Sequence, residues 1–236
     1  MKIKAVLFDL DGTLLPMDQD TFVKDYFGRI ARYLAPHGFD PDALIDAIWH
    51  GTGAMIANDG SMTNEDRFWA VASGMLGEDL RSKECYFNTF YRDEFDKVQG
   101  SCGFDPEVAP TLMALKERGY RLILATNPIF PAVATYKRIA WAGLAPADFE
   151  LITTYENSSF TKPTLDYYKN ILDRCGLFPE ECIMVGNDVG EDMVAERLGI
   201  GVYLITRDLI NRKGDDISAY PKGSISDLPS HLEGLG

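Results

Sequence analysis

The 236-residue sequence contains no long hydrophobic run, and every apolar segment is shorter than the roughly 20 residues that a membrane span requires. Its first residues, Met1-Lys2-Ile3-Lys4, lead directly into a short apolar run and do not show the pattern of a signal sequence. Glycine and proline are not in excess, which argues against a fibrous or disordered chain. We therefore expect a folded cytoplasmic protein that does not bind a membrane.

Positive charge is also scarce. The chain has 23 Lys and Arg residues against 36 Asp and Glu residues, which gives a formal net charge of −13. Such a charge opposes binding to polyanions, so we expect no nucleic-acid partner. A small phosphorylated substrate remains compatible with this charge, because a bound metal ion or a few local cations can reverse the field within one cleft.

Cysteine is rare, and the four cysteines show no CxxC spacing. They are Cys85, Cys102, Cys175 and Cys182. Because a chain of this length can bury a core without crosslinks, we expect buried, reduced thiols and no disulfide framework. The absence of a Cys and His cluster also argues against a zinc site.

Short apolar runs recur along most of the chain, as expected of buried strands. They span residues 3–8, 122–125, 151–153, 183–185 and 202–205. Helical patterns lie between the later runs, at 108–116, 132–140, 165–175 and 192–198. Because alternating strands and helices form parallel sheets, we predict an α/β core with helices on both faces of the sheet.

The stretch from Pro16 to Gly100 differs, because it shows helical patterns and no strand signal. Four apolar, aromatic-rich helical faces follow one another there, and Thr63 with Asp66 fits a capping box in front of the third. We predict an inserted helical domain at 16–100 and an α/β core at 1–15 and 101–236. The aromatic side chains are expected to form its core more often than a ligand site.

Two acids directly follow the first apolar run, in Phe8-Asp9-Leu10-Asp11-Gly12-Thr13. The carboxyl ends of strands in an open α/β sheet are where ligands bind. Asp9 and Asp11 are two residues apart and project to the same side of an extended segment, which is costly unless a cation lies between them. Gly12 permits a sharp turn that would present its N–H to an anion.

A second acidic pair follows the fourth apolar run. Asp188 and Asp192 are four residues apart, which places both on one face if a helix begins there. Acids are also common at helix N-termini for electrostatic reasons, and this alternative stays open for the pair alone. Together with Asp9 and Asp11, however, they offer enough oxygen ligands for one hard divalent cation, for which Mg²⁺ is the best candidate.

Polar residues follow two further apolar runs. Thr126 and Asn127 come after 122–125, where a hydroxyl and a backbone N–H would hold phosphate oxygens. Lys162 comes after 151–153 and would bring a positive charge to the same edge of the sheet. A lysine taken by itself is more often a surface residue, so its position is what recommends it.

These motifs resemble those of the haloacid dehalogenase superfamily, over nearly the whole chain. Asp9-Leu10-Asp11-Gly12-Thr13 is similar to the first motif of that family, Thr126 to the second, Lys162 to the third, and Asp188 with Asp192 to the fourth. The inserted helical segment resembles the helical cap of phosphoglycolate phosphatase and β-phosphoglucomutase relatives. The resemblance implies a Rossmann-like core with a cap.

The resemblance also implies an activity, namely magnesium-dependent hydrolysis of a small phosphorylated metabolite. It implies that Asp9 is the nucleophile that forms an aspartyl-phosphate, and that Asp11 is the general acid and base. The implied metal ligands are the Asp9 carboxylate, the Asp11 backbone carbonyl and Asp188, with Asp192 direct or in support. Since Asn187 stands between Gly186 and Asp188, where many relatives have Asp directly after Gly, the order of these last two stays open.

Three alternatives remain. A sugar-phosphate mutase would use the same core and return the phosphoryl group to its intermediate. A metal-independent dehalogenase would not need Asp11, and a non-catalytic binding protein would not need the full set of motif residues. The cap residues that set specificity are undecided among four candidates, which are Trp49, His50, Asn58 and Arg67.

Overall fold

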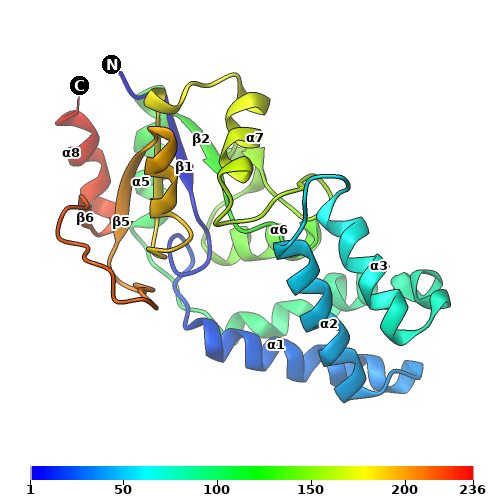
Figure 1. The fold of residues 1–236 in the computed structure, drawn as a ribbon. Helices are drawn as coiled ribbons and strands as arrows, with labels where there is room; N and C mark the ends of the chain where they lie inside the picture. The colour runs from blue at the N-terminus through cyan, green and yellow to red at the C-terminus, as the bar shows by residue number, and fades with distance from the viewer. Residues whose placement is uncertain (1, 236) are drawn as a thin grey trace.

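The computed structural model describes residues 2–235 and contains a six-stranded parallel sheet (Figure 1). The strands are β1 (Ala5–Phe8), β2 (Arg121–Leu124), β3 (Leu151–Ile152), β4 (Cys182–Gly186), β5 (Gly201–Ile205) and β6 (Lys222–Gly223). Their order is β3-β2-β1-β4-β5-β6, with every neighbouring pair parallel. The chain therefore reverses its direction of strand addition between β1 and β4, which is the switch point where open α/β sheets bind ligands.

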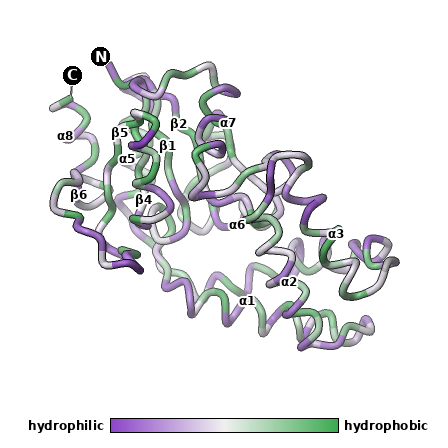
Figure 2. Tube along the Cα trace, viewed as in Figure 1, coloured by the Kyte–Doolittle hydropathy of each residue, from purple (hydrophilic) through white to green (hydrophobic). Residues whose placement is uncertain are grey.

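Helices cover both faces of this sheet. The α-helices are α1 (Gln19–Leu34), α2 (Pro41–Ile56), α3 (Asn64–Leu76), α4 (Glu84–Thr89), α5 (Val108–Glu117), α6 (Ala132–Trp141), α7 (Leu165–Cys175) and α8 (Leu228–Glu233). Alternate strand residues belong to two apolar clusters, one shared with α5, α6 and α8 and the other with α7. Strands β1, β2, β4 and β5 are apolar along most of their length, as Figure 2 shows, because both faces are buried. The predicted α/β core is confirmed.

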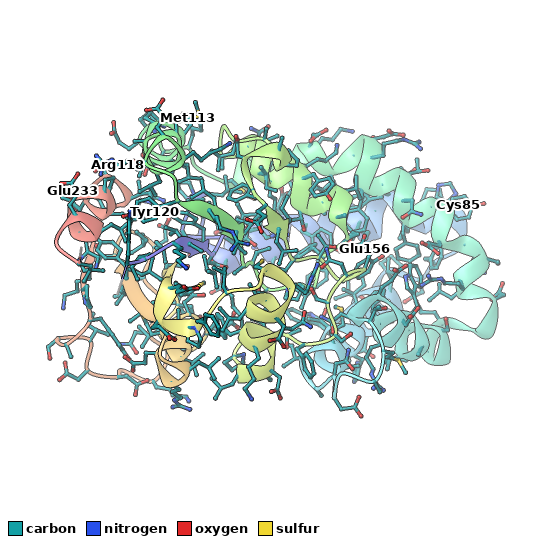
Figure 3. The ribbon with its side chains drawn as sticks, turned by 90° about the horizontal axis from the view of Figure 1, so that it is seen from above. Cys85, Met113, Arg118, Tyr120, Glu156 and Glu233 are labelled. Atoms are coloured by element: carbon teal, nitrogen blue, oxygen red, sulfur yellow. The ribbon has the colours of Figure 1, made fainter. Side chains whose placement is uncertain are left out.

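The segment between β1 and α5 is helical, as predicted, and extends away from the sheet as a cap (Figure 1). Thr63 caps α3, with its hydroxyl oxygen accepting from the Asp66 N–H at 3.1 Å. The two connections to the core run side by side, because the Gly103 N–H donates to the Pro16 carbonyl at 2.7 Å. Figure 3 shows Cys85 at the end of the cap farthest from α8. The boundaries 16 and 100 stay a prediction.

Some elements differ from the expectations. β6 and α8 were not predicted, and residues Met193–Leu198 form a 3-10 helix where the 192–198 pattern suggested a regular helix. A hydrophobic pattern that spans only two turns does not distinguish an α-helix from a 3-10 helix. The four cysteines are free, as expected, but Cys182 alone among them is buried and Cys85 is exposed.

No helix within the described part of the chain is both long enough and apolar enough to cross a membrane.

Candidate active site

The site lies where β1, β2 and β4 end side by side. Phe8 is in register with Leu124 on one side and Val185 on the other. The Asp9 N–H donates to the Val185 carbonyl at 2.9 Å, which fixes the residue after β1 against β4. The sheet register therefore brings together the polar residues that follow three separate strands, as their positions in the sequence predicted.

Lys162 links the first and fourth motifs. Its ammonium lies 2.8 Å from Asp9 Oδ1 and 2.6 Å from Asp192 Oδ1, and its side chain is 1% exposed. Burial alone would lower the pKa of Lys162, but the Asp192 and Asp9 carboxylates outweigh that effect and raise it well above its ordinary value. Lys162 is thus a buried, charged residue of the site and not a surface lysine.

Asp11 pairs with an arginine that the sequence analysis did not single out. The Arg138 guanidinium, on α6, forms a salt bridge with Asp11 Oδ2, and the Arg138 side chain is 1% exposed. Arg138 also lies over the Phe130 ring, with Cζ 4.4 Å from its centroid. Burial raises the pKa of the Asp11 carboxyl, and the Arg138 charge opposes this rise without cancelling it.

Arg138 could have been recognised from its position on the predicted helix. It lies one turn after Ala134 on the face that α6 buries, so it occupies an apolar position. A buried arginine needs an acidic partner, and a charged residue on a predicted apolar face is a signal for one. The sequence does not say which acid that partner is.

The loop after β4 packs against the first motif. The Asp188 carboxylate accepts from the Gly190 N–H at 2.8 Å and the Glu191 N–H at 3.0 Å, whereas Asp192 Oδ2 accepts from the Asp188 N–H at 3.0 Å. With its other oxygen on Lys162, Asp192 has both carboxylate oxygens engaged within the protein. This geometry favours Asp188 over Asp192 as a direct metal ligand.

Gly12 makes the turn that its sequence position predicted, at φ +82°. A Cβ atom at this position would lie 2.3 Å from Asn187 Nδ2, so the close approach of the two loops also requires glycine. Its N–H does not face an anion, however, because it donates to the Leu15 carbonyl at 2.7 Å. The expected phosphate contact of the Gly12 amide is therefore wrong for this structure, and the turn itself is what Gly12 provides.

Thr126 and Asn127 follow β2, and both line a cavity at the carboxyl ends of the strands. Thr126 is buried, and its carbonyl accepts from the Thr153 hydroxyl at 2.7 Å and the Tyr167 hydroxyl at 2.8 Å. The Asn127 amide donates to Glu191 Oε2 at 3.1 Å. Glu191 is a second residue that the sequence did not single out. Burial raises its pKa to about 7.

The cavity at the strand ends has the composition of a cation site. Five of its lining residues are acids, Asp9, Asp11, Asp188, Glu191 and Asp192, and no Lys, Arg or His of residues 2–235 is among the lining residues. Asp11 Oδ1 and Asn127 Oδ1 are buried there without a hydrogen-bond partner. A hard cation such as Mg²⁺ suits oxygen donors of this kind, so the residues fit the ion that the family resemblance implies.

The side chains are not gathered as a complete ligand set. Among the described residues, no three His, Cys, Asp or Glu side chains lie close enough together to hold a metal ion by themselves. Asp11 faces Arg138, and Asp192 faces Lys162. This arrangement argues against four carboxylates around one ion.

The four cap candidates are also separated by the structure. Trp49 lines a cavity under the cap, whereas Arg67 is engaged with Asp59 at 3.1 Å and Ser61 at 3.2 Å. Asn58 donates to Asn64 Oδ1 at 2.8 Å, and the His50 ring contacts the Asp46 carbonyl on its own helix. Trp49 is thus the candidate that faces a cavity.

Comparison with known proteins agrees with this geometry. A model of the haloacid dehalogenase-like hydrolase family matches residues 3–199. The chain is 30% identical to glyceraldehyde 3-phosphate phosphatase of Methanocaldococcus jannaschii, over 99% of this chain and 98% of that protein. It is 25% identical to phosphoglycolate phosphatase of Vibrio vulnificus, over 98% of this chain and 95% of that one.

A solved structure shows the same fold. The 2-haloacid dehalogenase of Pseudomonas syringae pv. tomato aligns with a TM-score of 0.66 at 18% identity, over 99% of this chain and 100% of that one. The family model covers all four motifs that meet at the strand ends, from Asp9 to Asp192. The chain therefore belongs to the haloacid dehalogenase-like hydrolase family.

Proposed function

We propose that the protein is a magnesium-dependent phosphatase that hydrolyses a small phosphorylated metabolite through an aspartyl-phosphate on Asp9. The observation that carries the proposal is that Asp9 and Asp11 line one cavity, with the buried Lys162 ammonium 2.8 Å from Asp9 behind them. The similarity to glyceraldehyde 3-phosphate and phosphoglycolate phosphatases supports a phosphate ester as the substrate class.

In the first step, Asp9 attacks the phosphorus atom and the P–O bond to the alcohol breaks. Asp11 gives its proton to the leaving oxygen, so the alcohol departs neutral. Lys162, with the hydroxyl of Thr126 and the amide of Asn127, neutralises and orients the phosphoryl oxygens. A raised pKa, which burial gives to Asp11, suits a carboxyl that must hold a proton before it acts.

In the second step, Asp11 takes a proton from water, and the resulting hydroxide attacks the phosphorus of the aspartyl-phosphate. The acyl phosphate bond breaks and returns the free Asp9 carboxylate with inorganic phosphate. Asp9, the Asp11 carbonyl and Asp188 would hold a Mg²⁺ ion, which would stabilise the charge on the transferring group. Asp192 keeps Lys162 in place between the two motifs.

The second acid of the first motif separates this proposal from a dehalogenase. A halide leaves without a proton, whereas an alkoxide needs one. A general acid such as Asp11, which Arg138 holds in place, is therefore needed only for an oxygen leaving group. A sugar-phosphate mutase shares this chemistry and differs only in the acceptor of the second step.

A substrate screen tests the proposal. Phosphate monoesters are incubated with the protein, with and without Mg²⁺, and released phosphate is measured beside halide release from 2-haloacids. We expect magnesium-dependent phosphate release that is lost in Asp9→Ala. Halide release without phosphate release would overturn the proposal, and conversion between isomeric sugar phosphates without phosphate release would assign a mutase.

A further inference from the structure

A second cavity lies beneath the cap and borders the catalytic cavity. It offers about 90 Å³ between α1, α2 and α3 on the cap side and the loop after β2 on the core side. Val23, Ile129 and Phe130 line both cavities. A molecule whose phosphate lies beside Asp9 would therefore extend past these three side chains into the space under the cap.

The wall of this second cavity is mainly aromatic. More than half of its lining side chains are Phe, Tyr or Trp, and most of the remainder are aliphatic. The hydroxyls of Tyr26 and Tyr91 lie 2.6 Å apart and hydrogen-bond to each other, so much of their polar capacity is used within the protein. Such a wall offers apolar contact and little hydrogen bonding.

The cavity also contains no positive charge. No Lys, Arg or His within residues 2–235 is among its lining residues. Arg67, the arginine among the four cap candidates, hydrogen-bonds to Asp59 and Ser61 instead. A carboxylate or a second phosphate placed there would lose its hydration without gaining a cationic partner, which is unfavourable. The cavity therefore disfavours substrates with a second anionic group, phosphoglycolate among them.

Several of the lining side chains are not packed as a closed core would be. Trp49 is 52% exposed, and its ring lies 5.0 Å from that of the half-buried Phe27. Ile129 and Phe130, at the passage between the cavities, are also only half-buried. Large apolar side chains left accessible around a cavity are typical of a ligand site.

We propose that the substrate is the phosphate monoester of an uncharged, apolar alcohol with a group of about ring size, and that the cavity under the cap binds this group. The inference rests on the proposed phosphatase function, because it assumes that the phosphate lies beside Asp9. The alcohol oxygen then lies at the passage between the cavities, near Asp11, which gives it a proton as the P–O bond breaks.

Three esters of primary alcohols test this inference, because the bond that breaks is of the same type in each. They are benzyl phosphate, ethyl phosphate and phosphoglycolate, and kcat/KM is measured for each with Mg²⁺. We expect kcat/KM for benzyl phosphate to exceed the other two values by about tenfold or more, as a filled apolar pocket gives. Trp49→Ala should lower the benzyl phosphate value about tenfold and leave ethyl phosphate within about twofold.

Two further variants complete the test. Val23→Phe narrows the passage and should reduce benzyl phosphate hydrolysis while ethyl phosphate hydrolysis persists. Phe178→Ala is the matched control, because it removes an aromatic ring that is 65% exposed and lines neither cavity, and it should change none of the three values.

The possible results separate the two proposals. If ethyl phosphate is hydrolysed but phosphoglycolate is preferred over benzyl phosphate, the apolar assignment is wrong and the phosphatase proposal stands. Equal losses on all three esters in Trp49→Ala would likewise overturn the assignment. If no ester is hydrolysed with Mg²⁺, the phosphatase proposal itself fails, and the apolar assignment fails with it.

Discussion

Replacing Arg138 with methionine should destabilise the protein by leaving the Asp11 carboxylate buried without its partner. The Arg138 side chain is 1% exposed and that of Asp11 is 21% exposed, so water replaces little of the lost interaction. Breaking a buried ion pair in this way typically costs about 3–5 kcal/mol of unfolding free energy. Because Asp11 reaches the cavity, we expect the lower end of that range, about 3 kcal/mol.

A double-mutant cycle isolates the pair from other effects of the substitution. Asp11→Asn removes the charge that Arg138→Met leaves unpaired, so the double variant should be more stable than the sum of the two single losses by about 2 kcal/mol. Unfolding free energies are measured in urea with a chelator present, so that no metal ion replaces the lost charge. Additivity of the two single changes to within about 0.5 kcal/mol would show that Arg138 and Asp11 do not stabilise the protein as a pair.

The control is the Lys137→Met substitution at the residue next to Arg138. Lys137 pairs with Asp96, whose side chain is 57% exposed, so the interaction is screened by water. Lys137→Met should cost less than about 1 kcal/mol. A loss as large as that of Arg138→Met would show that any charge removal from α6 destabilises the cap–core junction, and that burial of the Arg138 pair is not the cause.

Two further outcomes are expected. A chelator should abolish phosphate release and added Mg²⁺ should restore it, because five acids line the catalytic cavity; full turnover in chelator would contradict the metal assignment. In Asp11→Asn, the single-turnover rate of alkyl phosphate hydrolysis should fall by about 10²–10⁴-fold. The rate of the first step with p-nitrophenyl phosphate should fall much less, because nitrophenolate leaves without a proton. Equal losses for both esters would show that Asp11 does not act as the general acid.

The sheet was predictable because its strands are buried on both faces and therefore appear as uninterrupted apolar runs. β6 was missed for the opposite reason, since Lys222 and Gly223 form a two-residue edge strand with no apolar signal. α8 is six residues long and has a proline near its start, so its pattern is too short to recognise.

The site was predictable where its residues directly follow strands, because parallel strands bring their carboxyl ends to one edge. This applies to Asp9, Thr126 and Asp188. The pairing of Arg138 with Asp11 could not be found, because the two residues lie 127 positions apart in the sequence and only the packing of α6 against the first motif joins them. The cavity under the cap was also beyond the sequence, since it depends on how the cap helices meet the loop of Ile129 and Phe130.

In the proposed reaction the phosphoryl group passes through Asp9. The most direct test is to quench the protein in acid during turnover of p-nitrophenyl phosphate with Mg²⁺, and to map the phosphorylated residue by mass spectrometry. We predict a phosphate mass on the peptide that contains Asp9, with more of it in Asp11→Asn, where water is not activated, and none in Asp9→Ala. Turnover with no adduct in Asp11→Asn, or an adduct on another residue, would contradict the account.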